Sequence, residues 1–196
     1  MHTTASDGRS TVAERVEQAR ERGLEAVAIT DHDRVPDELD SRSRTIGGLE
    51  LITGVEVKAE IRDTKIEILG YYVNPSADEL EEVLGRVRGY REERNRKMTE
   101  RFVKVTGIET SYKEMCEHAE GSLGRPHFAR LLIEEGLVDT ISEAFDNYLD
   151  EDGEVYVPSQ KVGYEAVLRA VHEAGGVTSL AHPGRIDAEI GEVREI

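Results

Sequence analysis

EAVAITDHD, the sequence of residues 25–33, indicates the fold class more clearly than any other part of the chain. Its apolar first part has the length and composition of a short buried strand, and His32 comes directly after it. The same arrangement recurs in VTSLAHP, residues 177–183, where His182 follows a second short apolar run. In α/β folds, functional groups gather at the ends of strands. Both stretches therefore predict an α/β protein with a site at its strand ends.

Strand and helix patterns alternate along the rest of the chain. Capping boxes that begin at Thr11 and Ser76 predict two helix starts, and the second helix is expected to run to about residue 105. Further helices are expected at residues 111–119, 126–135, 140–149 and 163–174, and strands at residues 25–30, 49–59, 65–73 and 177–181. The second and third of these strands are expected to pair. This alternation predicts a mainly parallel sheet or barrel.

The helices between residues 76 and 150 have no predicted strand among them, which indicates an insertion. We expect an α/β body from residues 1–75 and 151–196, with residues 76–150 as a helical substrate cap. Within the cap, residues 85–104 carry eight basic and three acidic side chains. This basic excess either forms a solvated, salt-bridged face or contacts substrate phosphates, and Arg91 and Arg94 are candidates for substrate binding.

The composition argues against several classes of protein. The 196 residues include 25 Lys and Arg against 41 Asp and Glu, and the net charge of -16 disfavours nucleic-acid binding by the whole surface. A single cysteine, Cys116, cannot form an intramolecular disulfide. The sequence shows no apolar run long enough to span a membrane and no signal peptide. We therefore expect a cytoplasmic protein.

Histidines and carboxylates supply the candidate metal ligands. The strand-end positions of His32 and His182 favour a ligand role for both. Spacing alone leaves the other candidates open between a ligand and an ordinary polar residue: His2, Asp7, Glu56 and His127. Imidazole and carboxylate together suit zinc, manganese or iron, and a carboxylate such as Glu56 can bridge two ions. Closely spaced ions can generate a hydroxide near neutral pH and stabilise an in-line displacement at phosphorus.

Six strings, in order along the chain, resemble the motifs of the PHP family, the polymerase and histidinol phosphatase superfamily of metal-dependent phosphoesterases. They are HT…SDG at residues 2–8, TDHD at 30–33, GVE at 54–56, LGY at 69–71, GRPH at 124–127 and AHPGR at 181–185. The resemblance covers nearly the whole chain. The GRPH string, the EAF string at residues 143–145 and the basic helix are most similar to the branch that hydrolyses nucleoside 3′,5′-bisphosphates and trims short RNA from its 5′ end.

The resemblance implies a distorted (β/α)7 barrel that holds up to three divalent ions: manganese, zinc or iron. By motif match, the implied metal ligands are His2, Asp7, His32, Glu56, His127 and His182. Of the family's opening Asp-x-His-x-His string, only the last two positions are present here, as Met1 and His2. The family's closing Asp-x-His pair does not follow the AHP string in this sequence. The resemblance therefore implies an incomplete barrel, truncated at both ends.

The implied function is hydrolysis of a phosphate ester by a metal-bound hydroxide, with a nucleotide or short RNA as substrate. Arg125, ahead of a predicted helix N-terminus, and Arg185, near His182, are candidate phosphate-binding residues. Arg125 and Asp31 are the candidate catalytic residues. Two alternatives stay open: a non-catalytic metal-binding remnant of the family, and a phosphatase of the histidinol-phosphate type. Neither a protein partner nor a membrane is implied.

Overall fold

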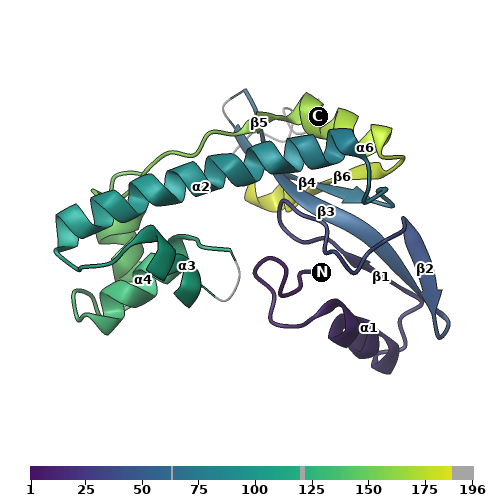
Figure 1. The fold of residues 1–196 in the computed structure, drawn as a ribbon, viewed down its shortest axis with the longest axis horizontal. Helices are drawn as coiled ribbons and strands as arrows, with labels where there is room; N and C mark the ends of the chain where they lie inside the picture. Colours follow the sequence, from purple (N-terminus) through teal and green to yellow (C-terminus); the bar gives the residue numbers. More distant parts are fainter. Residues whose placement is uncertain (63, 120–121, 187–196) are drawn as a thin grey trace. The chain divides into compact units, whose positions relative to one another are not determined.

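The computed structural model describes residues 1–62, 64–119 and 122–186 (Figure 1). The chain divides into two compact units. The sheet unit comprises residues 1–88 and 161–196, and the helical unit comprises residues 89–160. The chain thus leaves the sheet unit once, forms the helical unit, and returns. A substrate-cap role for residues 76–150 remains a prediction.

The sheet is organised around one long strand. Within the described residues its strands are β1 (Ala26–Ile29), β2 (Ser43–Ile46), β3 (Leu49–Ile61), β4 (Thr64–Tyr71), β5 (Val162–Gly163) and β6 (Val177–Ala181). The order is β1-β3-β4-β6, and β2 and β5 also pair with β3. Strand β3 is therefore fixed by neighbours along its whole length, which makes it a rigid base for any side chain that it carries.

The α/β class is confirmed, but the prediction of a mainly parallel sheet is wrong. Strand β3 pairs antiparallel with β2 and β4, and β4 pairs antiparallel with β6. Parallel pairing joins β3 to β1 and to the short β5. Strands β2, β3 and β4 follow one another through short links, and such links join antiparallel strands because parallel strands need a long crossover. The expected pairing of the second and third strands is confirmed as the β3–β4 hairpin.

Two amphipathic helices accompany the sheet. Helix α1 (Val12–Glu21) begins at the predicted capping box, in which Thr11 and Glu14 exchange side-chain and backbone hydrogen bonds. Its buried face packs against side chains of β1 and β3. Helix α6 (Tyr164–Glu173) packs against β3, β4 and β6. A Cβ at Gly70 of β4 would lie 3.0 Å from the Val171 side chain, so this glycine lets α6 approach the sheet closely.

The helical unit has its own apolar core. The unit contains the C-terminal part of α2 (Asp78–Thr106), the helices α3 (Tyr112–His118), α4 (Arg125–Glu134) and α5 (Ile141–Ala144), and the π-helical turn η1 (Phe145–Leu149). Phe102 and Phe128 are fully buried at its centre and meet edge to face, with ring centroids 5.5 Å apart. None of the helices in the described residues is both long enough and apolar enough to cross a membrane.

The predicted start of the long helix is one residue too early. Helix α2 begins at Asp78, so Ser76 is not its N-cap residue. The Ser76 N–H instead donates to the side chain of Asn74, and the Ala77 N–H donates to the Asn74 carbonyl. Asn74 therefore forms a turn that competes with an earlier helix start, as asparagine side chains commonly do.

Candidate metal centre

Glu56 lies in the middle of β3 and is 2% exposed. Segment 31–33 runs beside it: the Glu56 N–H donates to the Asp31 carbonyl, and the Asp33 N–H donates to the Glu56 carbonyl. These bonds hold His32 next to Glu56. The chain start is held in a similar way, because the Thr30 N–H donates to the Met1 carbonyl and so brings His2 to the same place.

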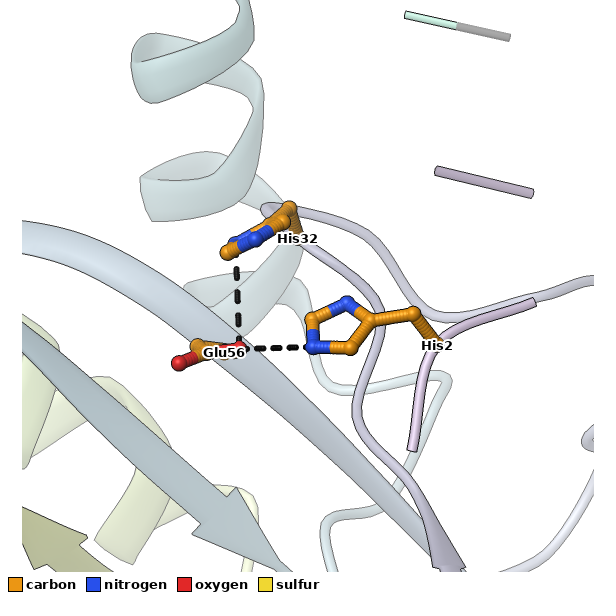
Figure 2. Close-up of side chains that lie close together, drawn as sticks. All are labelled: His2, His32 and Glu56. Atoms are coloured by element: carbon orange, nitrogen blue, oxygen red, sulfur yellow. Dashed lines mark ion pairs between the residues drawn. The ribbon is translucent and has the colours of Figure 1, made fainter. Parts of the chain in front are cut away.

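The two oxygens of Glu56 face different histidines. Oε2 lies 3.0 Å from His2 Nε2 and 3.8 Å from His32 Nδ1. Figure 2 shows these two contacts as dashed lines. Oε1 lies 3.3 Å from His182 Nε2. The structure thus brings together three of the predicted histidines around one buried carboxylate, although they come from distant parts of the sequence.

Asp7 adds a second carboxylate on the outer side of two of these rings. Its Oδ1 lies 3.3 Å from His2 Nδ1, and its Oδ2 lies 3.7 Å from His32 Nε2. His2 and His32 therefore each lie between the buried Glu56 and the exposed Asp7. Their ring centroids are 4.5 Å apart. Five of the predicted residues, counting His182, form one cluster in the sheet unit.

The electrostatics of the cluster differ from ring to ring. The hydrogen bond to Glu56 raises the pKa of His2, with burial opposing. Burial, assisted by the nearby Lys58 ammonium, lowers the pKa of His32. Burial alone would raise the pKa of Glu56, but the contact with His2 and the charges of the surrounding histidines lower it overall. Glu56 is thus kept ionised and His32 neutral, which are the states that bind a metal ion.

The donor set fits a divalent metal ion. His2, His32 and Glu56 each offer a ligand atom within 4.8 Å of the others. Moreover, His2 Nδ1, His32 Nδ1 and Glu56 Oε1 are buried without a hydrogen-bond partner. Buried polar atoms are nearly always satisfied in folded proteins, so unsatisfied atoms grouped in one place indicate a missing partner. Divalent cations bound within this cluster would satisfy them.

Backbone strain accompanies the site. His182 has a φ of 47° and Asp33 a φ of 56°, in the left-handed region that residues other than glycine rarely adopt. For His182 the strain is greater, because the following Pro183 favours extended backbone at the preceding residue. Strained residues persist only where surrounding contacts hold them, and they concentrate at functional sites. At His182 the strained backbone accompanies a ring whose Nε2 lies 3.3 Å from Glu56 Oε1.

Asp31 was predicted to be catalytic, but its surroundings favour a positioning role. Its side chain is fully buried and accepts hydrogen bonds from Thr3 N and Thr3 Oγ1, both at 2.7 Å, and from Ser6 Oγ. Both carboxylate oxygens are therefore occupied by the loop that follows His2 and carries Asp7. A Cβ at Gly8 would lie 2.4 Å from the His2 carbonyl oxygen, so this loop also depends on a glycine.

The other predicted site residues lie in the helical unit or outside the described part of the chain. His127 is in the first turn of α4, where its ring contacts the backbone of Gly124. Arg125 begins the same helix and contacts Asp150 at 3.3 Å. A ligand role for His127 and a phosphate-binding role for Arg125 remain predictions. The side chain of Arg185 lies outside the described residues.

The basic stretch of α2 is partly neutralised within the helix. Arg96 pairs with Glu92 at 2.7 Å and Lys97 pairs with Glu93 at 2.6 Å, both four residues apart. These pairs fit the interpretation of a solvated, salt-bridged face for that side of the helix. Arg94 differs, because it is partly buried and its guanidinium donates two hydrogen bonds to the neighbouring Asn95 side chain.

Glu67 is a site residue that the sequence analysis missed. It lies on β4, and its Oε2 is 4.0 Å from His182 Nε2. A signal was present: the alternation of β4 places Glu67 on the same face as Leu69 and Tyr71, next to the matched LGY string. Glu67 is the single acidic residue of that face. The expected pairing of this strand with the strand that carries Glu56 could have drawn attention to it.

An α/β fold with imidazoles and carboxylates gathered at a sheet is typical of metal-dependent hydrolases. The PHP domain model matches residues 1–190, and the chain belongs to the PHP family. The resemblance found in the sequence is therefore confirmed.

Three proteins similar to this chain illustrate the family. The 5′-3′ exoribonuclease Rnm of Salmonella typhimurium is 35% identical over 95% of the chain and 64% of its own length. The 3′,5′-nucleoside bisphosphate phosphatase of Chromobacterium violaceum is 30% identical over 95% of the chain and 66% of its own length. A crystal structure from Bifidobacterium adolescentis, assigned as a metal-dependent phosphoesterase, has a TM-score of 0.72, 30% identity, and coverage of 93% of this chain and 65% of that one. The chain thus spans just under two thirds of the length of these three proteins.

Proposed function

We propose that this protein is a metal-dependent phosphoesterase that acts on nucleoside 3′,5′-bisphosphates or on the 5′ ends of short RNA. The observation that carries the proposal is the buried Glu56 carboxylate, whose two oxygens face histidines from separate parts of the chain. The Salmonella and Chromobacterium relatives are named for activity on RNA and on nucleoside bisphosphates, which supports the substrate class.

The residues that would hold divalent metal are His2, Asp7, His32, Glu56 and His182. A bound divalent ion would supply Lewis-acid stabilisation of a phosphoryl oxygen and would lower the pKa of a water molecule to near neutrality. Imidazole and carboxylate donors suit manganese, iron or zinc. The chain itself supplies part of the preorganisation, because Asp31 fixes the loop that carries Asp7.

Binding of substrate phosphate is proposed for the arginines of the helical unit. Burial, together with the charges of Arg91 and Arg125, lowers the pKa of Arg94 to about 10. The charges of Arg91 and Arg125 both repel the Arg94 guanidinium, and a phosphate bound beside Arg94 would offset that repulsion. Such a group of arginines would suit the phosphates of a nucleotide or a short RNA.

The test is a comparison of substrates and variants under defined metal. The wild-type protein, supplied with manganese, is expected to release phosphate from a nucleoside 3′,5′-bisphosphate or mononucleotides from a 5′-phosphorylated short RNA. Glu56→Gln is expected to abolish turnover and to reduce bound metal, because an amide is a poor ligand and cannot bridge. Glu60→Gln is the matched control: Glu60 lies on the same strand but pairs with Lys161, so turnover should be kept.

Two results would contradict the proposal. Bound metal without turnover on either substrate would favour the non-catalytic metal-binding alternative. Faster hydrolysis of histidinol phosphate than of both nucleotide substrates would favour the histidinol-phosphate alternative, which gives no role to the arginines of the helical unit.

A further inference from the structure

Lys58 extends from the same strand as the buried carboxylate of the candidate metal centre. It lies two residues after Glu56 on β3, and alternate residues of a strand point to one face of the sheet. The Lys58 N–H donates to Asp33 Oδ1 at 3.2 Å, which ties this point of the strand to the segment that carries His32. The backbone of Lys58 is therefore fixed beside the cluster. Its side chain is not a metal ligand, because an ammonium group has no lone pair to donate.

The Lys58 ammonium lies at the edge of the cluster. In the β3–β4 pair, Lys58 is directly opposite Glu67, and its Nζ is 3.8 Å from Glu67 Oε1. The other oxygen of the same carboxylate, Oε2, is 4.0 Å from His182 Nε2. The ammonium is also close enough to His32 for its charge to lower the pKa of that ring. Lys58 thus places a positive charge beside the candidate metal ligands.

A simpler explanation for Lys58 is a cross-strand ion pair with Glu67. The distance of 3.8 Å is longer than a hydrogen bond, and more than half of the Lys58 side chain is exposed. Ion pairs of this kind contribute little to stability. Within the described part of the chain, no other acceptor pairs with the ammonium. The ammonium can therefore leave the Glu67 oxygen for another anion at little cost.

The anion that suits this position is a phosphate group. An ammonium is a compact point charge with three N–H donors, and lysine is a common ligand of phosphate oxygens. In hydrolysis of a phosphate ester, negative charge builds up on the phosphoryl oxygens, and a positive charge already in place stabilises it. A lysine on a rigid strand beside the metal cluster meets this requirement, because its backbone cannot shift away from the reacting group.

We propose that Lys58 binds a non-bridging oxygen of the phosphate group that reacts at the metal centre. This inference rests on the proposed function, because it takes the substrate to be a phosphate ester. Without substrate the ammonium stays near Glu67, and it turns to the phosphate when substrate binds. The role differs from that proposed for Arg91 and Arg94. Lys58 contacts the phosphate that is hydrolysed, so every phosphate ester that the protein hydrolyses should depend on it.

Binding of inorganic phosphate to the manganese-loaded protein, measured by titration calorimetry, tests the proposal without turnover. Lys58→Met removes the charge and keeps an apolar side chain of similar length. Phosphate binding should weaken about tenfold or more, because a hydrogen bond to a charged group is lost. Manganese binding should be equal or tighter, since a cation that repels the metal ion is gone. A purely structural role for Lys58 would not give these opposite effects.

Two further measurements concern charge and turnover. Lys58→Arg keeps the positive charge and should bind phosphate within about threefold of wild type, because one point charge is enough for this contact. In turnover, Lys58→Met should lower kcat/KM about tenfold or more for a nucleoside bisphosphate and for a small monoester alike. An effect on the bisphosphate alone would move Lys58 away from the reacting phosphate and overturn the proposal.

Controls separate the role of Lys58 from the proposed function. Lys161→Met is the matched control: Lys161 also lies beside β3, but its ammonium is hydrogen-bonded to Glu60 at 3.2 Å, so phosphate binding should not change. Turnover by the wild type with equal phosphate binding in Lys58→Met would overturn the role of Lys58 and leave the proposed function intact. Loss of manganese or a lower urea midpoint in Lys58→Met would assign a structural role and also overturn it. A manganese-loaded wild type that neither binds phosphate nor hydrolyses a phosphate ester would overturn both.

Discussion

Replacing Asp31 by asparagine tests whether the site depends on the loop that follows His2. The change keeps the shape of the side chain but removes its charge and turns one oxygen into an N–H donor. In the structure, Oδ1 accepts from Thr3 N and Ser6 Oγ, and Oδ2 accepts from Thr3 Oγ1. The new amide would face the Thr3 hydroxyl, which already accepts a hydrogen bond from Ala5 N. Two bonds are thus weakened and the third must reverse its direction.

The size of the effect follows from these three bonds. A hydrogen bond to a charged group contributes about 1.5–3 kcal/mol, and a neutral one about half as much. Weakening two bonds by about 1 kcal/mol each and disturbing the third gives a loss of about 2–4 kcal/mol in the free energy of unfolding. Because the loop carries Asp7 and follows His2, metal affinity should also fall. A loss of about 10- to 100-fold is typical when a residue that positions metal ligands is mutated.

Urea unfolding of the metal-free protein and manganese titration of the folded protein measure the two effects separately. Asp40→Asn is the control, since Asp40 is exposed and pairs only loosely with Arg44 at 3.5 Å. Its stability should change by no more than about 0.5 kcal/mol. Ser6→Ala removes one of the three donors and should give a smaller loss than Asp31→Asn. If Asp31→Asn lost less than about 1 kcal/mol and kept wild-type metal affinity, the positioning role of Asp31 would be refuted.

The remaining predictions concern pH, packing and substrate binding. In the metal-free protein, the raised pKa of His2 stabilises the fold at pH values below 6.5, the ordinary pKa of histidine, and this stabilisation is lost as the pH rises through the folded-state pKa. The lowered pKa of Glu56 stabilises the fold at pH values above 4.5, its ordinary pKa, and this stabilisation is lost as the pH falls through the folded-state pKa. The stability difference between wild type and His2→Gln, from urea unfolding, should therefore be largest between pH 4.5 and 6.5. Gly54→Ala places a Cβ 2.6 Å from a backbone oxygen of β4, so we expect a loss of about 3 kcal/mol or more, or no folded protein, in thermal unfolding. Reversal of Arg91 and Arg94 to Glu should raise KM for a nucleoside bisphosphate about tenfold or more and spare a small monoester; equal effects on both would contradict phosphate binding by these residues.

Much of the fold could be predicted because local patterns in the sequence are strong. The capping box at Thr11, the apolar run before His32 and the apolar run before His182 correspond to α1, β1 and β6. Strands β2 and β5 could not be found in this way, since they are four and two residues long and carry no apolar alternation. They exist because β3 offers them hydrogen-bond partners, which is a tertiary effect.

The sequence also predicted five of the residues that meet at the candidate site, but not Glu67. Strand ends and flanking residues indicated His32 and His182 as ligands, and the structure brings both to Glu56. Glu67 was missed because its position beside His182 depends on the register of the β3–β4 hairpin and on the antiparallel β4–β6 pairing, neither of which the sequence predicted. Without the register of the strands, an acidic residue in an alternating strand cannot be distinguished from a surface residue.

The contacts around Glu56 join the chain start at His2 to the distant His182, with His32 between them in the sequence. In an unfolded chain these side chains are dispersed, so an ion held by them would bind the folded form alone. Such an ion would act as a reversible cross-link, and the melting temperature would rise with its free concentration. At 100 times its dissociation constant the ion would add about 2.7 kcal/mol to the free energy of unfolding. A chelator would then lower the thermal resistance of the protein together with its turnover, because the same side chains supply both.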